Sequence, residues 1–186
     1  MDLGFRMHAE RTPNPNSVKW VLSQPLAEGG EGAHFPEPVA DAVSPLAARL
    51  FAVEGVVGVF VAGNFVTVTK GEDVDWAELA QGVVDAIKAH VASDDSTFGP
   101  DWEAPSEQAG GDGVAARIRT ILETEVRPAV AQDGGDIIFA GYRDGVVEVY
   151  LQGSCSGCPS STFTLKMGIE QRLREEIPEV QEVVAL

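Results

Sequence analysis

Cysteine, basic residues and long hydrophobic runs are all scarce in this sequence. Its 186 residues include two cysteines, and 13 Lys and Arg stand against 29 Asp and Glu, which gives a net charge of -16. We do not expect so acidic a chain to bind nucleic acid or anionic lipid, because both are negatively charged. No run of 18 apolar residues occurs, so we expect no membrane span.

The opening residues lack the features of a targeting segment. Met1-Asp-Leu-Gly-Phe-Arg-Met7 has no apolar core of a signal peptide, and it is neither Arg-rich nor free of acid, as a transit peptide would be. Two cysteines without a secretion signal favour a reducing compartment, where such a pair more often binds metal or exchanges disulfides than forms a structural disulfide. We therefore predict a bacterial cytoplasmic protein. A mature mitochondrial matrix protein, with its presequence removed, would share these features.

The first 91 residues have the pattern of a small α+β domain. Turn residues and alternating apolar positions predict a strand within 12–22 and a hairpin of two strands within 56–70. Residues 23–43 are rich in Gly, Pro and Glu and are predicted to be a loop. N-cap chemistry followed by helical spacing predicts helices at 44–51 and 75–91.

Residues 92–113 are acidic and contain no Lys or Arg. We predict a flexible linker here, about 25 Å long as a random coil, because like charges repel and few apolar groups are available for burial. Phe98 and Trp102 are the two residues of this tract that could dock on a neighbouring surface.

Residues 114–186 predict a second α+β domain with the element order α-β-β-α-β. Its first helix is expected to stop near Arg127-Pro128 or one turn later. Two strands, near 137–142 and 146–152, flank an Asp-Gly hairpin turn, and a second helix and a last strand follow. The fold class is therefore α+β with two small domains, each a hairpin-containing sheet covered by helices: 1–91, the linker 92–113, and 114–186. We assign Asp133-Gly134-Gly135-Asp136 to the turn after the first helix.

Both cysteines lie in the stretch Gly153-Ser-Cys-Ser-Gly-Cys-Pro-Ser-Ser161, between a predicted strand and a predicted helix. The free backbone N–H groups and the dipole at the start of that helix favour thiolates at Cys155 and Cys158. Thiolates are equally suited to binding a soft metal ion and to exchanging disulfides. A hairpin rather than a βαβ unit precedes the pair, and Ser-Gly rather than Pro lies within it, so the pattern favours metal. Redox exchange and a pair of inert buried thiols stay open.

The number of available ligands limits what kind of metal site is possible. A tetrahedral zinc or an iron–sulfur cluster needs about four protein ligands. The domain with the cysteines has no histidine, because His8, His34 and His90 all lie in the first half of the chain, where we expect them to face solvent. A second copy of the chain would supply the missing pair, and such a shared site opens easily, as suits a carrier.

Three stretches make the chain resemble the Nfu family of iron–sulfur cluster carriers. Two of them, the cysteine stretch and Arg127-Pro-Ala-Val-Ala-Gln-Asp-Gly-Gly-Asp136, are similar to the C-terminal domain of NifU. The third, Arg11-Thr-Pro-Asn-Pro-Asn-Ser-Val-Lys19, is similar to the N-terminal domain of longer Nfu proteins. The resemblance covers most of the chain outside the linker.

The resemblance implies an iron–sulfur cluster assembly protein and not an enzyme. Cys155 and Cys158 from each of two subunits would hold a [4Fe-4S] cluster, with a [2Fe-2S] form as a possible precursor. The implied partners are an upstream scaffold, apo iron–sulfur client proteins and a second copy of the chain. A dithiol–disulfide oxidoreductase and a zinc-stabilised interaction module are the alternative functions. Lys166 and Arg172, on the helix after the cysteines, would either offset the cluster's charge or form an ordinary solvated helix face.

Overall fold

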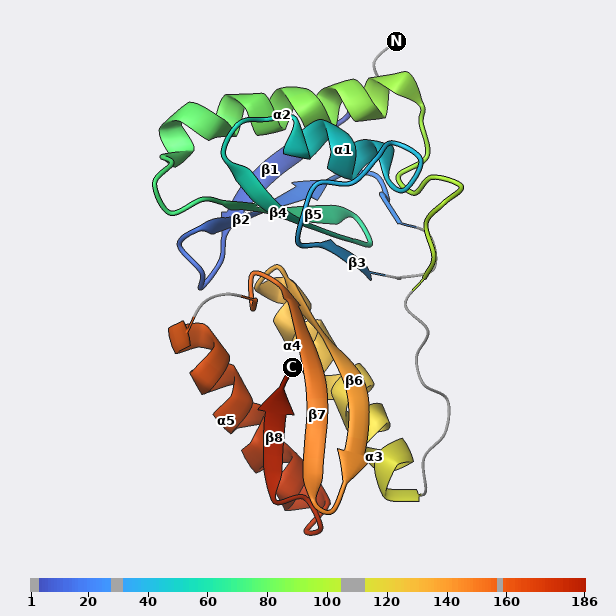
Figure 1. Cartoon of the computed structure of the whole chain (residues 1–186), viewed down its shortest axis with the longest axis vertical. Helices are drawn as coiled ribbons and strands as arrows, with labels where there is room; N and C mark the ends of the chain where they lie inside the picture. Colours follow the sequence, from blue (N-terminus) through green and yellow to red (C-terminus); the bar gives the residue numbers. More distant parts are fainter. Residues whose placement is uncertain (1–3, 28–31, 105–112, 157–158) are drawn as a thin grey trace. The chain divides into compact units, whose positions relative to one another are not determined.

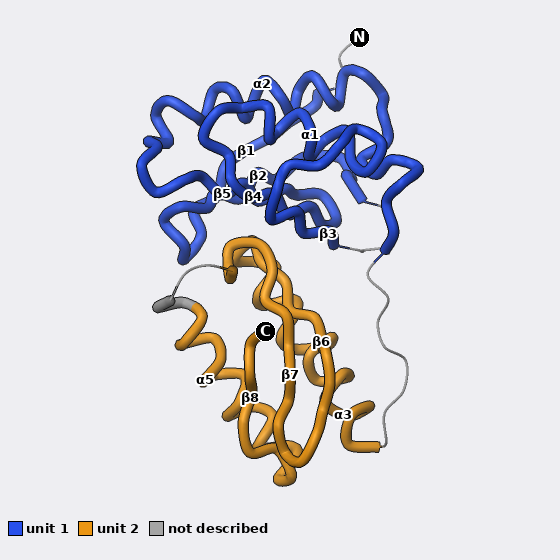
Figure 2. Tube along the Cα trace, in the orientation of Figure 1, with its two compact units in different colours: residues 1–105 blue, residues 106–186 orange. Residues whose placement is uncertain are grey.

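The computed structural model describes residues 4–27, 32–104, 113–156 and 159–186; the side chains of 159–161 are not described. The chain divides into two compact units, Met1–Pro105 and Ser106–Leu186, which Figure 2 shows in different colours. We call them unit 1 and unit 2. Within the described ranges, no helix combines the length and the apolar character that crossing a membrane requires.

Unit 1 is a sheet of five antiparallel strands with two helices over one face (Figure 1). The strand order is β1-β2-β5-β4-β3. The strands and helices, in chain order, are β1 (Met7–Arg11), β2 (Ser17–Leu22), β3 (Gly32–Phe35), α1 (Pro45–Phe51), β4 (Val56–Ala62), β5 (Phe65–Lys70) and α2 (Trp76–Ser93).

Local sequence chemistry explains where the helices of unit 1 begin. The Ser44 hydroxyl accepts a hydrogen bond from the Ala47 N–H at 3.2 Å and caps α1, while the Asp75 carboxylate accepts one from the Ala77 N–H at 3.3 Å and caps α2. One face of α2 packs on the sheet through apolar residues spaced four apart, which are fully or almost fully buried: Leu79, Val83 and Ile87. Both predicted helices and the predicted hairpin are confirmed.

Two strands of unit 1 were not predicted. β1 and β3 are the two edges of the sheet, and each pairs with one neighbour only. The sequence of β1, Met-His-Ala-Glu-Arg, is polar, and that of β3, Gly-Ala-His-Phe, is four residues long. Neither is long or apolar enough to give an alternation signal. The prediction of a loop throughout 23–43 is therefore wrong for β3.

The segment after α2 packs on unit 1, although the sequence predicted a flexible linker from residue 92. α2 continues to Ser93, and the rings of Phe98 and Trp102 stack with their centroids 4.1 Å apart, against the core of unit 1. The Gly99 N–H donates to the Val43 carbonyl at 2.9 Å, and the Asp101 N–H to the Ala42 carbonyl at 2.8 Å. Aromatic burial and these backbone hydrogen bonds outweigh the mutual repulsion of the acidic residues. Residues 105–112 of the predicted linker lie outside the described residues.

Unit 2 is a three-stranded sheet with its helices on one face (Figure 1). The order is β6-β7-β8; β6 and β7 pair antiparallel, and β7 and β8 pair parallel. The elements are α3 (Gly113–Ile121), the π-helical turn η2 (Leu122–Val126), α4 (Arg127–Gln132), β6 (Gly135–Arg143), β7 (Val146–Gly153), α5 (Pro159–Glu176) and β8 (Glu182–Ala185). The predicted order α-β-β-α-β and the α+β class are confirmed.

The first helical segment of unit 2 runs without a break from α3 through η2 to α4. The Arg127 N–H donates to the Leu122 carbonyl, five residues back, so the turn holds one residue more than an α-helical turn. Pro128, which follows, has no N–H to donate. The helix therefore passes the proline and ends one turn later, at Gln132.

Candidate metal-binding turn between β7 and α5

Residues 154–158 join the end of β7 to the start of α5, and we call this connection the cysteine turn after its described part, 154–156. Cys155 lies in that described part and is 7% exposed. Cys158 comes directly before Pro159, the first residue of α5, as the sequence predicted. Because 157 and 158 lie outside the described residues, the convergence of the two sulfur atoms stays a prediction.

The described part of this cysteine turn is fixed to the elements on either side. The Ser154 N–H donates to the Gly134 carbonyl at 3.2 Å, and the Ser154 hydroxyl donates to the Asp133 carbonyl. On the other side, the Thr162 hydroxyl of α5 donates to the Cys155 carbonyl at 3.1 Å. Cys155 is thus held between the end of α4 and the first turns of α5.

Gly135 lets the Cys155 sulfur approach the backbone of β6. A Cβ atom at Gly135 would lie 2.5 Å from Cys155 Sγ and 2.9 Å from the Gln152 carbonyl oxygen, both closer than real Cβ contacts allow. The sequence predicted a turn over Asp133-Gly134-Gly135-Asp136. Asp133 and Gly134 form that turn, with a φ of 76° at Gly134, whereas Gly135 and Asp136 already belong to β6. Two adjacent glycines were the available signal for the contact of Gly135 with the sulfur, which the prediction missed.

An ion pair fixes the start of β6 close to the cysteine turn. The Arg127 guanidinium of α4 donates to both carboxylate oxygens of Asp136, at 2.9 Å each. The Asp136 side chain is 8% exposed, and its Oδ1 also accepts from the Ile137 N–H at 2.8 Å. A bidentate pair of this kind fixes orientation as well as distance. Arg127 and Asp136 therefore position the backbone on which Cys155 packs, a role that the sequence alone did not suggest.

The two cations of α5 that the sequence singled out both form ion pairs. Lys166 Nζ lies 3.4 Å from Glu182 Oε1. Arg172 Nε lies 2.7 Å from Glu125 Oε2, and the hydrogen bonds to Glu125 and Glu176 raise the pKa of the guanidinium above its ordinary value. Arg172 thus joins α5 to η2. The solvated-face interpretation fits Arg172 better than a role in offsetting cluster charge.

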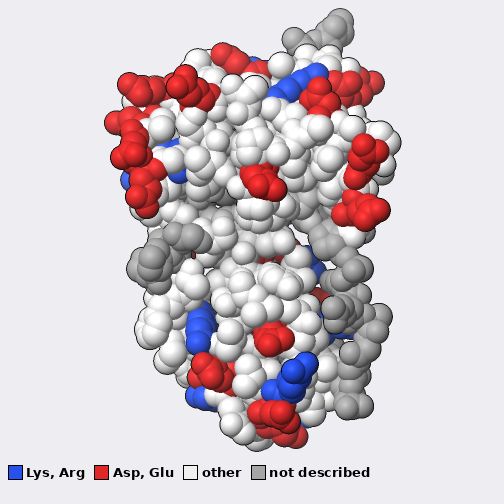
Figure 3. Space-filling view, in the orientation of Figure 1, with Lys and Arg blue, Asp and Glu red and all other residues white. Residues whose placement is uncertain are grey.

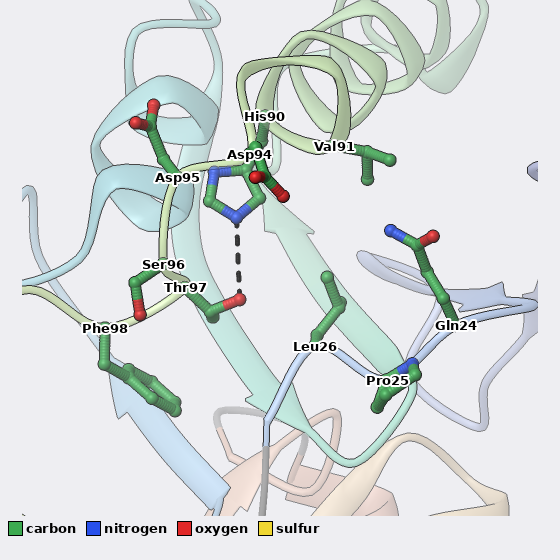
Figure 4. A pocket seen from close by; sticks show the side chains of 10 residues that line it. All are labelled: Gln24, Pro25, Leu26, His90, Val91, Asp94, Asp95, Ser96, Thr97 and Phe98. Carbon is green, nitrogen blue, oxygen red and sulfur yellow. Dashed lines mark hydrogen bonds between the residues drawn. The ribbon is translucent and has the colours of Figure 1, made fainter.

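All three histidines lie in unit 1, apart from the cysteines. His90 is 3% exposed and His34 is half-buried, so the expectation that all three histidines face solvent is wrong for these two. The Nδ1 of His90 lies 3.5 Å from an Arg49 nitrogen and its Nε2 lies 3.5 Å from the Thr97 hydroxyl; burial lowers the pKa of His90, and the Arg49 charge lowers it further. Figure 4 shows His90 in the wall of a cavity of about 480 Å³ that contains no cysteine. Among the residues that the structure describes, no three His, Cys, Asp or Glu side chains are arranged to hold a metal ion.

These features define a class of protein: a two-unit α+β chain with one thiol pair, which lies before a helix of unit 2. Two family models match the chain. The model described as "Scaffold protein Nfu/NifU N terminal" matches residues 7–94, and the "NifU-like domain" model matches residues 118–184.

Curated relatives match nearly the whole chain. It is 44% identical over 181 residues to "NFU1 iron-sulfur cluster scaffold homolog, mitochondrial" of Homo sapiens, with 95% of this chain and 70% of the human protein covered. The Drosophila erecta protein of the same name is 40% identical, with 63% of its length covered. "NifU-like protein 4, mitochondrial" of Arabidopsis thaliana is 38% identical, with 64% covered. The chain belongs to the Nfu family, as its motifs predicted, and it spans about two thirds of the length of these relatives.

Solved structures match parts of the chain. A solution structure of a NifU-like protein from Saccharomyces cerevisiae is 19% identical with a TM-score of 0.45, covering 53% of this chain and 89% of that one. A crystal structure of protein SAV1430 from Staphylococcus aureus is 26% identical with a TM-score of 0.41, covering 44% of this chain and 98% of that one.

Proposed function

We propose that this protein is an iron–sulfur cluster carrier. Cys155 and Cys158 of two copies hold a [4Fe-4S] cluster between them, and the cluster is then delivered to apo-proteins. The observation that carries the proposal is that the chain's only two cysteines lie in the five residues between β7 and α5, in a member of the Nfu family. The relatives named as iron–sulfur cluster scaffold homologues support the same cargo.

The residues present fit this cargo in their chemistry. Iron–sulfur clusters are held by cysteine thiolates, usually four of them. One copy supplies two, and the histidines of the chain lie in unit 1. Two copies related by a twofold axis would supply four equivalent thiolates. A site divided equally between two subunits opens when they part, which suits delivery better than permanent storage.

Loading requires a local movement at Cys155. Its side chain packs on Gly135 and is 7% exposed, so the sulfur must turn outward to reach iron. The hydrogen bonds of Ser154 and Thr162 anchor the backbone on either side of the Cys155 side chain, so they can persist during this movement. Burial before loading also limits oxidation of the thiol, which depends on exposure.

Anaerobic reconstitution with iron and sulfide tests the proposal. The expected product is brown, contains about four irons and four sulfides per two chains, and sediments as a dimer of the 19.7 kDa chain. Cys155→Ser and Cys158→Ser should each abolish iron binding, while His8→Gln in unit 1, a matched change of a possible ligand, should leave it intact. A colourless monomer that turned over disulfides would establish the oxidoreductase alternative. Stoichiometric zinc as purified, with a fold that a chelator destroys, would establish the zinc module.

The remaining parts of the proposal concern partners and location. We propose an upstream scaffold as donor, apo iron–sulfur proteins as clients, and no catalytic activity of the carrier itself. A [2Fe-2S] form before the [4Fe-4S] form would be seen in the visible spectrum during reconstitution. Location in a bacterial cytoplasm stays a prediction, and the mitochondrial matrix is its alternative, since the relatives described above are named as mitochondrial.

A further inference from the structure

Helix α5 is apolar on two opposite sides. Its inner side packs in the core of unit 2 through Leu165, Ile169 and Leu173. On its outer side, Phe163 is 66% exposed and Met167 is 50% exposed. Phe163 is two residues from Leu165, which places their side chains roughly 160° apart around the helix axis. The outer side of a surface helix is normally polar, so this exposed apolar pair needs an explanation.

The apolar pair lies beside the cysteine turn. Thr162, whose hydroxyl holds the Cys155 carbonyl at 3.1 Å, is the residue directly before Phe163. Met167 follows Phe163 by about one helical turn. Next to Met167, a Cβ added at Gly168 would meet no atom within 4 Å, so the helix surface there is open. We call Phe163 and Met167 the outer α5 patch.

The charge around the patch differs from the charge of the chain as a whole. Residues 149–169 contain no Asp or Glu, and their one charged residue is Lys166, in a chain with a net charge of -16. On the face drawn in Figure 3, the charged side chains of unit 2 gather toward its lower end in the view. Two copies of so acidic a chain repel each other over most of their surfaces. Around this patch, two identical copies can approach without that repulsion.

We propose that the outer α5 patch of one copy packs against the same patch of a second copy when both hold one cluster. The proposal rests on the proposed function and adds the surface through which the two copies touch. A twofold axis near the cysteine turns would bring Phe163 and Met167 of both copies together, because the same surface serves both sides of a twofold interface.

The size of the patch explains why the contact depends on cargo. Phe163 and Met167 together expose roughly 200 Å² per copy, against about 800 Å² per partner in a stable interface. The patch alone is too small to hold two copies together. With the cluster bound, the same apolar area adds to the metal–sulfur bonds and shields the cluster from water. The pair therefore separates once the cargo has left.

The double variant Phe163→Ser/Met167→Ser tests this contact in the full-length chain. After anaerobic reconstitution, sedimentation velocity should show the dissociation constant of the loaded dimer raised at least tenfold over that of the unsubstituted chain. Tyr150→Ser is the matched control, because Tyr150 is 48% exposed on β7, between residues that face the core, and its loss should leave the constant unchanged. A double variant that loads and dimerises like the unsubstituted chain would overturn the inference.

A photoreactive p-benzoylphenylalanine at position 163 gives a second readout that does not depend on the stability of the serine variant. Irradiation of the loaded chain should yield an adduct of about twice 19.7 kDa, joined to residues of α5 in the other copy. An adduct within one chain, to unit 1, would overturn the inference, and so would an adduct to an added apo client protein in place of the second copy. An unsubstituted chain that binds no cluster, or binds one as a monomer, would instead overturn the proposed function itself.

Discussion

The two units share one motif and use it differently. In each, a helix is followed by an antiparallel hairpin and a second helix: α1, β4, β5 and α2 in unit 1, and α4, β6, β7 and α5 in unit 2. The connection from the hairpin to the second helix is residues 71–75 in one and residues 154–158 in the other, five residues in both. The first contains three carboxylates, and the second contains both cysteines of the chain.

The last residue of each connection comes directly before the helix. In unit 1 this residue is Asp75, which caps α2, and in unit 2 it is Cys158. A negative group is favoured at a helix start in either case, by the free N–H groups and the helix dipole. A carboxylate there only stabilises the helix, whereas a thiolate is also a soft metal ligand. The same sequence position, directly before a helix, thus serves stability in unit 1 and, as we propose, cargo binding in unit 2.

Cys158→Asn gives unit 2 a capping residue like that of unit 1 and removes a thiol. Iron bound after reconstitution should fall at least tenfold, because an amide is a poor ligand for iron. The free energy of unfolding of unit 2 should stay unchanged or rise by up to about 1 kcal/mol, because Asn is a good N-cap. Iron and sulfide analysis, with hydrogen exchange of peptides from β6 and β7, measures both effects. Asp75→Asn is the matched control and should change neither the iron bound nor the stability of unit 2. A large loss of stability in C158N would mean that Cys158 has a structural role.

Gly135→Ala should destabilise unit 2 by about 1–3 kcal/mol, the range for overpacking a close-packed site. The added methyl group would meet the Gln152 carbonyl as well as the Cys155 sulfur, and a paired strand cannot move away. Gly168→Ala, where no atom lies within 4 Å of the new group, should instead stabilise α5 by about 0.5–1 kcal/mol. Hydrogen exchange in β6 and β7 measures both changes in stability. If Gly135→Ala stabilised unit 2 as much as Gly168→Ala does, the close packing at Gly135 would be contradicted.

Acid should destabilise unit 1 more than unit 2, because all three histidines lie in unit 1. Burial lowers the pKa of His34 and of His90, so the unfolded chain takes up protons near pH 6.5 that the folded unit does not. The stability of unit 1 is therefore complete above that pH and falls as the pH drops, by at most about 1.4 kcal/mol per pH unit for each histidine.

Tryptophan emission measures this pH effect in unit 1 alone, since Trp20, Trp76 and Trp102 all belong to that unit. Denaturation midpoints at pH 7.5 and 5.5 should differ for unit 1, while exchange in β6 and β7 should show a smaller change for unit 2. In His90→Asn the dependence on pH should weaken. An equal loss of stability in both units at pH 5.5 would show that the buried histidines are not the source of the pH dependence.

Asp75→Ala should lower the free energy of unfolding of unit 1 by about 1 kcal/mol, the usual effect of removing an N-cap. The tryptophan emission of Trp76, the first residue of α2, reports the change. Asp73→Ala removes an exposed carboxylate from the same connection without removing the cap, and it should have less effect. Equal effects of the two substitutions would indicate a charge effect and not capping.

Sequence reasoning recovered the features that depend on local chemistry. The turn at Asp144-Gly145 has φ values of 49° and 85°, the left-handed conformation that these residues predicted. N-caps and apolar spacing located the helices within two residues in unit 1. The cysteine pair was identified from composition and spacing, and the family from short motifs.

What sequence reasoning missed depends on contacts between distant residues. The polar edge strand β1 is defined by its pairing with β2, and Phe98 and Trp102 are held by the core of unit 1. The close approach of Gly135 to Cys155 joins residues that are twenty positions apart in the sequence. The adjacent Gly134 and Gly135 signal a close approach to the backbone, but they do not indicate which side chain makes it.

The π-helical turn η2 bears on which insertions and deletions this region tolerates. The turn holds one residue more than an α-helical turn, so deleting one residue within 122–126 would restore regular α-helical hydrogen bonding. Because the π-helical turn absorbs the extra residue, the segments on either side would keep roughly their rotation about the helix axis. Ile118 would stay in the core, and Arg127 would keep facing Asp136. A single-residue deletion is therefore tolerated better here than in a regular α-helical turn, where it would rotate the following residues by about 100°.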